Sequence, residues 1–259
     1  MNILSRSARW VARQLGYNLV RCQAGGWPVD FDGNAVATIE AVKPFTKTSP
    51  ERIQALSHSV RHIVETGVPG AFVECGVWRG GSMMAVARTL IEMGVTDRDL
   101  YLFDTYEGMS APTDLDVGRN GVTAESKFQK RATGADTSTW CLAGIEDVRA
   151  NMLSTGYPES RIHFVKGKVE DTLPHQAPEH ICLLRLDTDW YESTKHEMEH
   201  LYPRLTEGGF LIIDDYGDWL GARKAVDEYL SEKQLPLFLH RVDDTARLAV
   251  KPASGRAAA

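Results

Sequence analysis

The chain has 259 residues, a length that suits one large α/β domain with short terminal additions. Hydrophobic residues make up 43% and charged residues 25% of it, as in ordinary globular proteins, and no apolar run reaches the length of about 18 residues that predicts a membrane span. The formal net charge of −6 disfavours a nucleic-acid partner.

Residues 1–40 are predicted to hold an amphipathic helix and an extension ahead of the main domain. Arginines interrupt the segment, which excludes the apolar centre of a secretory signal, and no acidic residue occurs before Asp30. We expect a helix that packs on the domain or on a dimer partner; an organellar transit helix and a helix on a membrane surface are the alternatives. The apolar residues of one helical face are Leu4, Ala8, Val11 and Leu15.

Residues 41–252 are predicted to form one domain, which begins with a helix. Ser49 can cap this helix, Pro50 occupies its first position and Gly67 ends it. Its buried stripe is predicted to consist of Ile53, Leu56, Val60 and Ile63.

Strands and helices then alternate, which predicts an α/β fold: a Rossmann-like, doubly wound, mainly parallel seven-stranded sheet with an antiparallel C-terminal hairpin. Apolar runs typical of buried parallel strands occupy residues 71–75, 100–103, 162–165, 181–186 and 210–213. Helical patterns occupy residues 82–93, 145–155, 191–205 and 220–231. The hairpin is predicted from two final runs at residues 237–239 and 247–251.

Residues 105–143 break this alternation with a long polar segment, in which one helix is expected to start near Thr123. Loops longer than about 15 residues are uncommon in compact domains unless they are lids or disordered. Because this loop follows the carboxyl end of a strand, where open α/β sheets bind ligands, we predict a lid. Residues 253–259 are predicted to be a disordered tail.

The four cysteines, at positions 22, 75, 141 and 182, have no CxxC spacing. Cys75 and Cys182 lie inside apolar runs typical of buried strands. This pattern indicates reduced thiols in a cytoplasmic protein rather than a disulfide framework.

A glycine-containing turn follows the first predicted strand, in the sequence FVECGVWRGGS at residues 72–82. Glycine lets the backbone approach a ligand, and the N-terminus of the helix that follows favours an anionic group. A dinucleotide site of the GxGxxG type would need glycine where Trp78 stands. S-adenosylmethionine fits better, because Glu74 suits its ammonium group and the amides of residues 80–82 suit its carboxylate. A turn without a ligand is the alternative.

Asp104 ends the next predicted strand, in the sequence LFDT. An acid in this place can accept hydrogen bonds from both hydroxyls of a ribose. A turn aspartate is the alternative, but the spacing from the glycine-containing turn favours the ribose contact.

Two further strands end in pairs of acids: Asp187 and Asp189 in LRLDTDW, and Asp214 and Asp215 in LIIDDY. If these strands are neighbours, about 4.8 Å apart, the acids converge at one edge of the sheet. Several carboxylates in one cleft repel each other unless some are protonated or a cation lies among them. Oxygen ligands without clustered histidine or cysteine favour Mg²⁺ or Ca²⁺ over zinc. Helix capping by Asp189 and Asp215 is the alternative.

The sequence HEMEH at residues 196–200 matches the HExxH pattern of zinc proteases. On an ideal helix, His196 and His200 lie opposite the apolar stripe that contains Met198. We therefore expect both histidines on the solvent side, away from the strand ends, and a zinc protease is the weakest alternative.

Five segments in order resemble the macrocin-, mycinamicin- and novobiocin-type sugar O-methyltransferases, which methylate sugar hydroxyls on macrolide and aminocoumarin antibiotics. They are FVECGVWRGGS, LFDTYEGM, FVKGKVEDT, LRLDTDWYEST and IIDDY. The similarity covers residues 40–250, and it implies a class I methyltransferase fold, S-adenosylmethionine as methyl donor, Mg²⁺ as cofactor, and residues 105–143 as a lid over the acceptor.

The resemblance also implies roles for individual residues. Asp187, Asp214 and Asp215 would hold Mg²⁺, and Asp189 would be the general base beside Asp187 in the catalytic centre. The S-adenosylmethionine site would be lined by Thr48, Ser49, Glu74, Gly76, Ser82, Asp104, Thr105, Gly167, Val169, Glu170 and Asp187.

The expected mechanism follows from the poor ionisation of a sugar hydroxyl at neutral pH. Mg²⁺ bound to two neighbouring hydroxyls would lower the pKa of the acceptor, and Asp189 would take its proton. We expect a cytoplasmic O-methyltransferase that acts on a sugar or a glycosylated small molecule and forms a homo-oligomer, with a dimer favoured. A catechol- or phenol-type O-methyltransferase and a non-catalytic S-adenosylmethionine-binding module are the alternatives.

Overall fold

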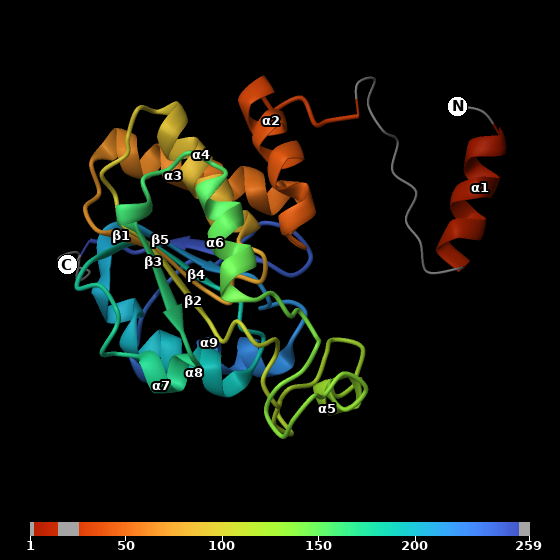
Figure 1. Ribbon diagram of the computed structural model, residues 1–259. Helices are drawn as coiled ribbons and strands as arrows, with labels where there is room; N and C mark the ends of the chain where they lie inside the picture. The colour runs from red at the N-terminus through yellow and green to blue at the C-terminus, as the bar shows by residue number, and fades with distance from the viewer. Residues whose placement is uncertain (1–2, 15–25, 254–259) are drawn as a thin grey trace. The chain divides into compact units, whose positions relative to one another are not determined.

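The computed structural model describes residues 3–14 and 26–253, and the chain divides into two units, Met1–Ala37 and Thr38–Ala259 (Figure 1). The helix expected near the N-terminus is present as α1, Ile3–Gln14. Leu15 and Cys22 lie outside the described residues, as does most of the predicted tail. A helix that the sequence did not predict, α2, spans Gly33–Val42. No helix in the described ranges is long and apolar enough to cross a membrane.

The helix expected after Ser49 has the predicted ends. It is α3, Pro50–Thr66; the Ser49 side chain accepts a hydrogen bond from the Arg52 amide, and Gly67 ends the helix with a φ of 70°. The predicted stripe is buried on it, at Ile53, Leu56, Val60 and Ile63.

Seven strands form one sheet in the order β3-β2-β1-β4-β5-β7-β6. The first five are parallel to one another and the last two are antiparallel. Their bounds are β1 Ala71–Cys75, β2 Leu100–Asp104, β3 Ile162–Lys166, β4 Ile181–Leu186, β5 Leu205–Ile213, β6 His240–Arg241 and β7 Arg247–Val250. The predicted fold is confirmed. The order reverses between β1 and β4, and open α/β sheets bind ligands at the carboxyl ends of strands at such a reversal.

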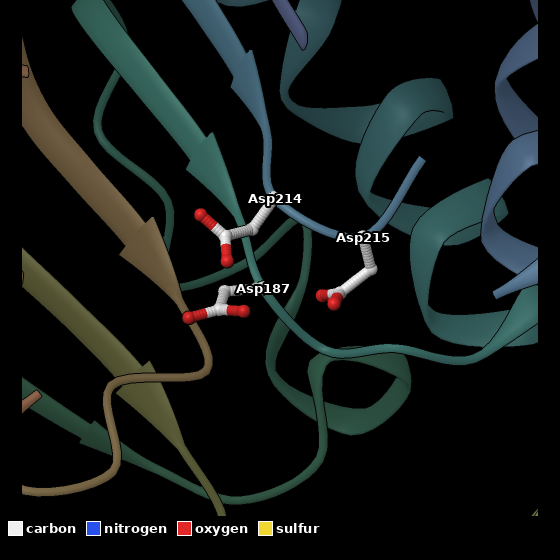
Figure 2. A group of neighbouring side chains, drawn as sticks. All are labelled: Asp187, Asp214 and Asp215. Carbon is white, nitrogen blue, oxygen red and sulfur yellow. The ribbon is translucent and has the colours of Figure 1, made fainter. Parts of the chain in front are cut away.

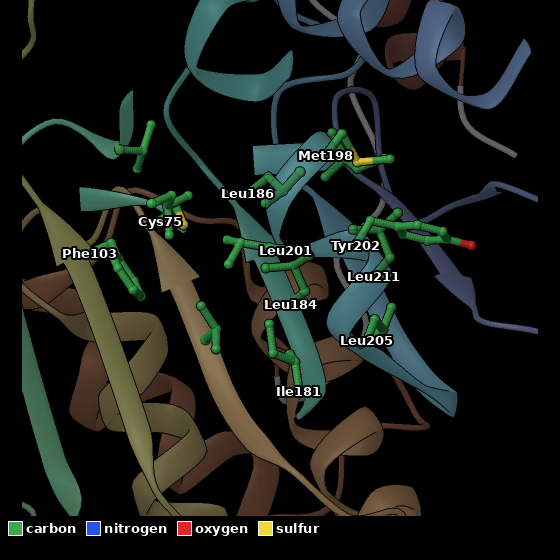
Figure 3. Packing of buried hydrophobic residues seen from close by; sticks show 14 of the residues in the cluster. Cys75, Phe103, Ile181, Leu184, Leu186, Met198, Leu201, Tyr202, Leu205 and Leu211 are labelled. Atoms are coloured by element: carbon green, nitrogen blue, oxygen red, sulfur yellow. The ribbon is translucent and has the colours of Figure 1, made fainter. Parts of the chain in front are cut away.

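The helices form two layers, one on each face of the sheet (Figure 1). One layer contains α3, α4 (Gly81–Glu92) and α6 (Ile145–Leu153), and the other contains α7 (Val169–Thr172), α8 (Tyr191–His200) and α9 (Leu220–Glu232). Short 3-10 turns occupy Lys43–Phe45, Glu159–Arg161 and Tyr202–Arg204. Apolar side chains fill the space between the sheet and the second layer, where Leu184 of β4, Leu211 of β5 and Met198 of α8 belong to one cluster (Figure 3). The burial of this apolar surface holds the strand ends in register.

The hairpin differs from the prediction at its first strand. The ladder forms at His240–Arg241 rather than at residues 237–239. Leu237 and Leu239 instead pack, partly buried, against the hydrophobic cluster. Their apolar character therefore reflects packing on the core rather than strand pairing.

The segment 105–143 contains turns and one short helix, α5, Ala124–Phe128, which Thr123 precedes as predicted. Asp116, which is fully buried, fixes this segment to the start of α8. Its Oδ1 accepts a hydrogen bond from the Tyr191 amide at 2.8 Å, and its Oδ2 accepts one from the Thr113 amide at 2.7 Å. Asp116 therefore supplies, from the lid, a cap for the first turn of α8.

Candidate active site

A pocket of about 370 Å³ lies at the carboxyl ends of β1, β2, β4 and β5 and gathers nearly all of the predicted site residues. Those that line it are Thr48, Glu74, Gly76, Ser82, Asp104, Thr105, Gly167, Val169, Glu170, Asp187, Asp189, Asp214 and Asp215. Ser49 is the exception. Its hydroxyl caps α3 and donates to Asp243 Oδ2 at 2.8 Å, so the structure gives this residue a capping role outside the pocket.

The turn after β1 requires glycine because two strand ends meet there. Gly76 has a φ of 81°, and its amide donates to the Phe103 carbonyl at 2.8 Å. A Cβ at Gly76 would collide with the carbonyl group of Asp187. The glycine thus brings the β1 turn directly against the acidic end of β4.

Glu74 and Arg185 form the buried centre of the site. Glu74 is 1% and Arg185 2% exposed, and the guanidinium Nη1 donates to the Glu74 carboxylate and to Asp187 Oδ2, the latter at 2.6 Å. Nη2 donates to Thr48 Oγ1 at 2.9 Å and to Asp214 Oδ1 at 2.5 Å. Burial raises the pKa of Glu74 to about 7, against the opposing effect of Arg185. The second oxygen, Oε2, is buried without a hydrogen-bond partner among the described residues.

Arg185 was not among the predicted site residues, although the sequence carried a signal. It interrupts the apolar run ICLLRL, which forms a strand buried at every position. A charged side chain in such a strand must be paired with opposite charge, because burying an unpaired charge is very costly. The arginine itself therefore indicated that carboxylates converge beside it.

Asp104, at the end of β2, lines the pocket and also holds two turns together. Its Oδ2 accepts hydrogen bonds from the amides of Val77 and Trp78 at 2.8 and 3.2 Å, and its Oδ1 accepts one from the Tyr106 amide at 2.7 Å. Burial raises the pKa of Asp104, and these amide bonds oppose the rise. The predicted ribose contact and the turn-forming alternative are therefore compatible at this residue.

Asp187, Asp214 and Asp215 converge from the ends of two neighbouring strands, and each offers an oxygen within 4.8 Å of the others (Figure 2). The register explains this, because Leu186 pairs with Ile213 immediately before them. Burial raises the pKa of both Asp187 and Asp215. Neither Asp189 nor Asp215 caps a helix through its side chain, since α8 and α9 begin after Trp190 and Trp219.

The chemistry of this cluster fits a divalent cation. Its donors are carboxylate oxygens, which Mg²⁺ prefers, and Asp215 Oδ2 is buried without a partner among the described residues. Arg185 pairs with Asp187 and Asp214, and Arg52 pairs with Asp214. The carboxylates of the pocket nevertheless outnumber these guanidinium groups, which leaves negative charge for a cation to balance.

Asp189 lies next to this cluster, in a backbone conformation that non-glycine residues rarely adopt, with a φ of 70°. Burial raises its pKa to about 8. The loop that carries it is held from behind, because Thr188 Oγ1 donates to Glu197 Oε1 of α8 at 3.0 Å. Such strain concentrates at functional sites, where the surrounding structure enforces it.

The HEMEH segment does not form a zinc-protease centre among the described residues. Glu197, which would be the general base, is fully buried and bonds Thr188 instead. His196 and His200 are half-buried with ring centroids 4.3 Å apart, and the metal-compatible group found among the described residues is Asp187, Asp214 and Asp215.

Residues 29–249 match the macrocin O-methyltransferase family. The chain is 35% identical over 201 residues, 77% of its length and 73% of the relative's, to 8-demethyl-8-(2,3-dimethoxy-alpha-L-rhamnosyl)-tetracenomycin-C 4'-O-methyltransferase of Streptomyces olivaceus. It is 34% identical over 184 residues, 71% and 69% of the two chains, to mycinamicin III 3''-O-methyltransferase of Micromonospora griseorubida. The solved O-methyltransferase NovP superposes with a TM-score of 0.70 at 28% identity, over 81% of this chain and 83% of that one. The chain belongs to the macrocin O-methyltransferase family and is an O-methyltransferase with the class I fold.

Proposed function

We propose that this O-methyltransferase transfers the methyl group of S-adenosylmethionine to a hydroxyl of a sugar or glycosylated small molecule, with the help of bound Mg²⁺. The observation that carries the proposal is the convergence of Asp187, Asp214 and Asp215 in the pocket that also contains Glu74 and Asp104. The names of the relatives support a sugar hydroxyl, since one acts on a rhamnosyl derivative.

The methyl donor is assigned to the side of the pocket formed by β1 and β2. Glu74 has one buried oxygen free to accept from an ammonium group. Asp104 lines the pocket at the end of β2 and would accept from ribose hydroxyls. Gly76, Ser82, Thr48 and the Gly167–Glu170 turn close this side.

Asp187, Asp214 and Asp215 would hold the divalent cation. When bound, the cation would supply positive charge that lowers the pKa of an acceptor hydroxyl and orients it. Asp189 would take the hydroxyl proton, and its position in the pocket lining beside this cluster supports that role. The lid, fixed by Asp116, would exclude water and hold the acceptor in line with the methyl group.

The free thiols of Cys75, Cys141 and Cys182 support the cytoplasm as the compartment, because thiols stay reduced there.

The proposal is tested with purified protein, S-adenosylmethionine labelled in its methyl group, and two acceptor panels: glycosides with vicinal hydroxyls, and catechols. We expect label in the glycosides. Label in catechols alone would replace the sugar with a phenolic acceptor. Binding of S-adenosylmethionine without transfer to any acceptor would indicate a non-catalytic module and contradict the proposal.

A further inference from the structure

Three tryptophan rings pack together beside the acidic cluster. Trp190 meets Trp140 and Trp219 edge to face, with ring centroids 5.6 and 5.1 Å apart and interplanar angles of 74° and 80°. The rings of Trp140 and Trp219 are 6.2 Å apart. Trp190 precedes α8, Trp219 precedes α9 and Trp140 comes from the lid, so the fold assembles this cluster from three distant segments.

Trp190 bonds to the protein, whereas Trp140 and Trp219 line the pocket. Trp190 is 4% exposed, and its Nε1 donates to the Ser110 carbonyl at 3.2 Å. Trp140 and Trp219 line the pocket. Among the described residues, neither of their indole N–H groups has a protein acceptor. Trp219 is itself 4% exposed, so the aromatic surface open to a ligand belongs mainly to the half-buried Trp140 ring, and both indole N–H groups can act as donors.

The pocket-lining rings of Trp140 and Trp219 form an aromatic wall, which lies next to the acids that the proposed function uses. Trp190 follows Asp189 in the chain, and the Trp219 amide donates to the Asp215 carbonyl at 2.9 Å. An acceptor that presents a hydroxyl to Asp189 would extend its remaining atoms along this wall.

The lid places positive charge over the same wall. The Lys127 ammonium group lies 4.9 Å from the centroid of the Trp219 ring and 5.8 Å from that of Trp140, and the Arg131 guanidinium carbon lies 6.0 Å from that of Trp140. A cation–π contact of this kind is weaker than a charge-assisted hydrogen bond to a carboxylate or phosphate. An anionic group that reached Lys127 would therefore draw the ammonium group away from the rings.

Neither of these two cations has an acidic partner among the described residues. The same holds for Lys47 of the pocket, which donates to Cys141 Sγ at 2.9 Å. Arg52 and Lys168, which also line the pocket, pair with Asp243 and Asp136 respectively. Asp218 lines the pocket too, but it is already paired with Arg119 at 3.3 Å. The wall therefore carries uncompensated positive charge close to an otherwise acidic centre.

We propose that Trp140, Trp219 and Lys127 form the acceptor subsite, and that the acceptor carries a phosphate or carboxylate group near the methylated sugar. This inference rests on the proposed function, whose acceptor it specifies. The C–H groups of a pyranose carry partial positive charge and stack on the negative face of an indole ring. Lys127 binds the anionic group, and Arg131 adds positive charge at the rim.

The test is calorimetric binding of three probes to the full chain: a hexose 1-phosphate, a methyl hexuronide and a neutral methyl hexoside. We expect at least one charged probe to bind about tenfold or more tightly than the neutral one, and the better of the two charged probes identifies phosphate or carboxylate as the preferred group. Lys127→Ala removes this preference, whereas Lys130→Ala, at an exposed lid lysine outside the pocket, preserves it. Trp140→Ala weakens all three probes, with S-adenosylmethionine affinity unchanged as the control for folding.

Equal affinity for the three probes, no binding of the charged probes, or an undiminished preference in Lys127→Ala overturns the inference. Methyl transfer, measured separately, distinguishes this failure from failure of the proposed function. If neutral glycosides are methylated without any preference for charge, the proposed function stands and the subsite inference fails. If charged probes bind through Lys127 but no sugar is methylated, the subsite stands and the proposed function fails.

Discussion

Arg185 of β4 and Glu74 of β1 lie opposite each other in the parallel ladder and form an ion pair between two almost fully buried side chains. The same guanidinium group reaches Asp187 and Asp214. One buried cation therefore links the predicted methyl-donor side of the pocket to the predicted metal side.

Loss of this cation should destabilise the fold. Arg185→Met leaves Glu74 buried without its partner and leaves Asp214 with Arg52 alone. Removal of one partner from a buried ion pair costs about 3–5 kcal/mol. We expect urea unfolding to show a loss of this size. The control is Arg149→Met, which breaks a pair with Glu159 at 2.8 Å on the surface and should cost less than about 1 kcal/mol. Equal losses of unfolding free energy in the two variants would show that the buried pair contributes no more to stability than the surface pair.

Asp104 should contribute to binding of the methyl donor. Asp104→Ala removes an acceptor for ribose hydroxyls, and we expect calorimetry to show S-adenosylmethionine affinity reduced about tenfold or more. Asp99→Ala is the matched control, because Asp99 precedes the same strand and pairs with Arg161 and His163. If both variants bind like the wild type, Asp104 acts only in the turns.

Glu197 should make the stability of the protein fall as the pH rises. Burial raises the pKa of Glu197 well above its ordinary value, so the folded state holds a proton that the unfolded state releases above about pH 4.3. Wild-type stability is then lost progressively between the unfolded and the folded pKa, while Glu197→Gln avoids this loss.

Urea unfolding at pH 5 and pH 8 measures the effect of Glu197. We expect Glu197→Gln to gain stability relative to the wild type as the pH rises, and Glu199→Gln, at an exposed position of the same helix, to show no such trend. A difference between wild type and Glu197→Gln that does not depend on pH would refute a protonated Glu197.

Asp243 should have the opposite effect to Glu197: its contribution to the stability of the protein should grow as the pH rises. Burial alone would raise its pKa, but hydrogen bonds from the Ala246 and Thr245 amides, Arg52 and Ser49 outweigh burial and lower it. Its stabilisation is therefore present above the ordinary aspartate pKa of about 3.9 and is lost as the pH falls toward the folded value. Asp243→Asn should lower the free energy of unfolding by about 1–3 kcal/mol at pH 7 and by less at pH 3.

The exposed neighbour of Asp243 supplies the control. Asp244→Asn changes a side chain that is 79% exposed and should have little effect at either pH. An Asp243→Asn loss as large at pH 3 as at pH 7 would contradict the assigned shift.

The sequence predicted the positions of residues whose placement depends on one strand end. Asp104, Asp187 and Asp214 each follow an apolar run, and parallel strands bring their carboxyl ends to one edge. The apolar run and the acid were therefore enough to place them. The glycine of the turn was predicted to let the backbone approach a ligand, whereas its close approach to Asp187 is seen only in the structure.

Residues whose role depends on distant partners escaped prediction. Ser49 was assigned to the pocket, yet its hydroxyl bonds Asp243, which a loop far along the chain supplies. The tryptophan cluster has the same origin, since Trp140 comes from a lid without repeating pattern. Leu237 and Leu239 show why the first hairpin strand was predicted at the wrong residues. Apolar spacing does not distinguish side chains that pack on a core from residues that pair in a ladder.

The central claim is that the three convergent aspartates hold a cation on which methyl transfer depends. Its most direct test is the initial rate of methyl transfer to a glycoside after chelation with EDTA and during titration with Mg²⁺, for the wild type and for Asp187→Asn. We predict negligible transfer after chelation, recovery with Mg²⁺ in the wild type alone, and S-adenosylmethionine binding in both proteins. Full transfer in EDTA, or Mg²⁺-dependent recovery in Asp187→Asn equal to that of the wild type, would contradict the account.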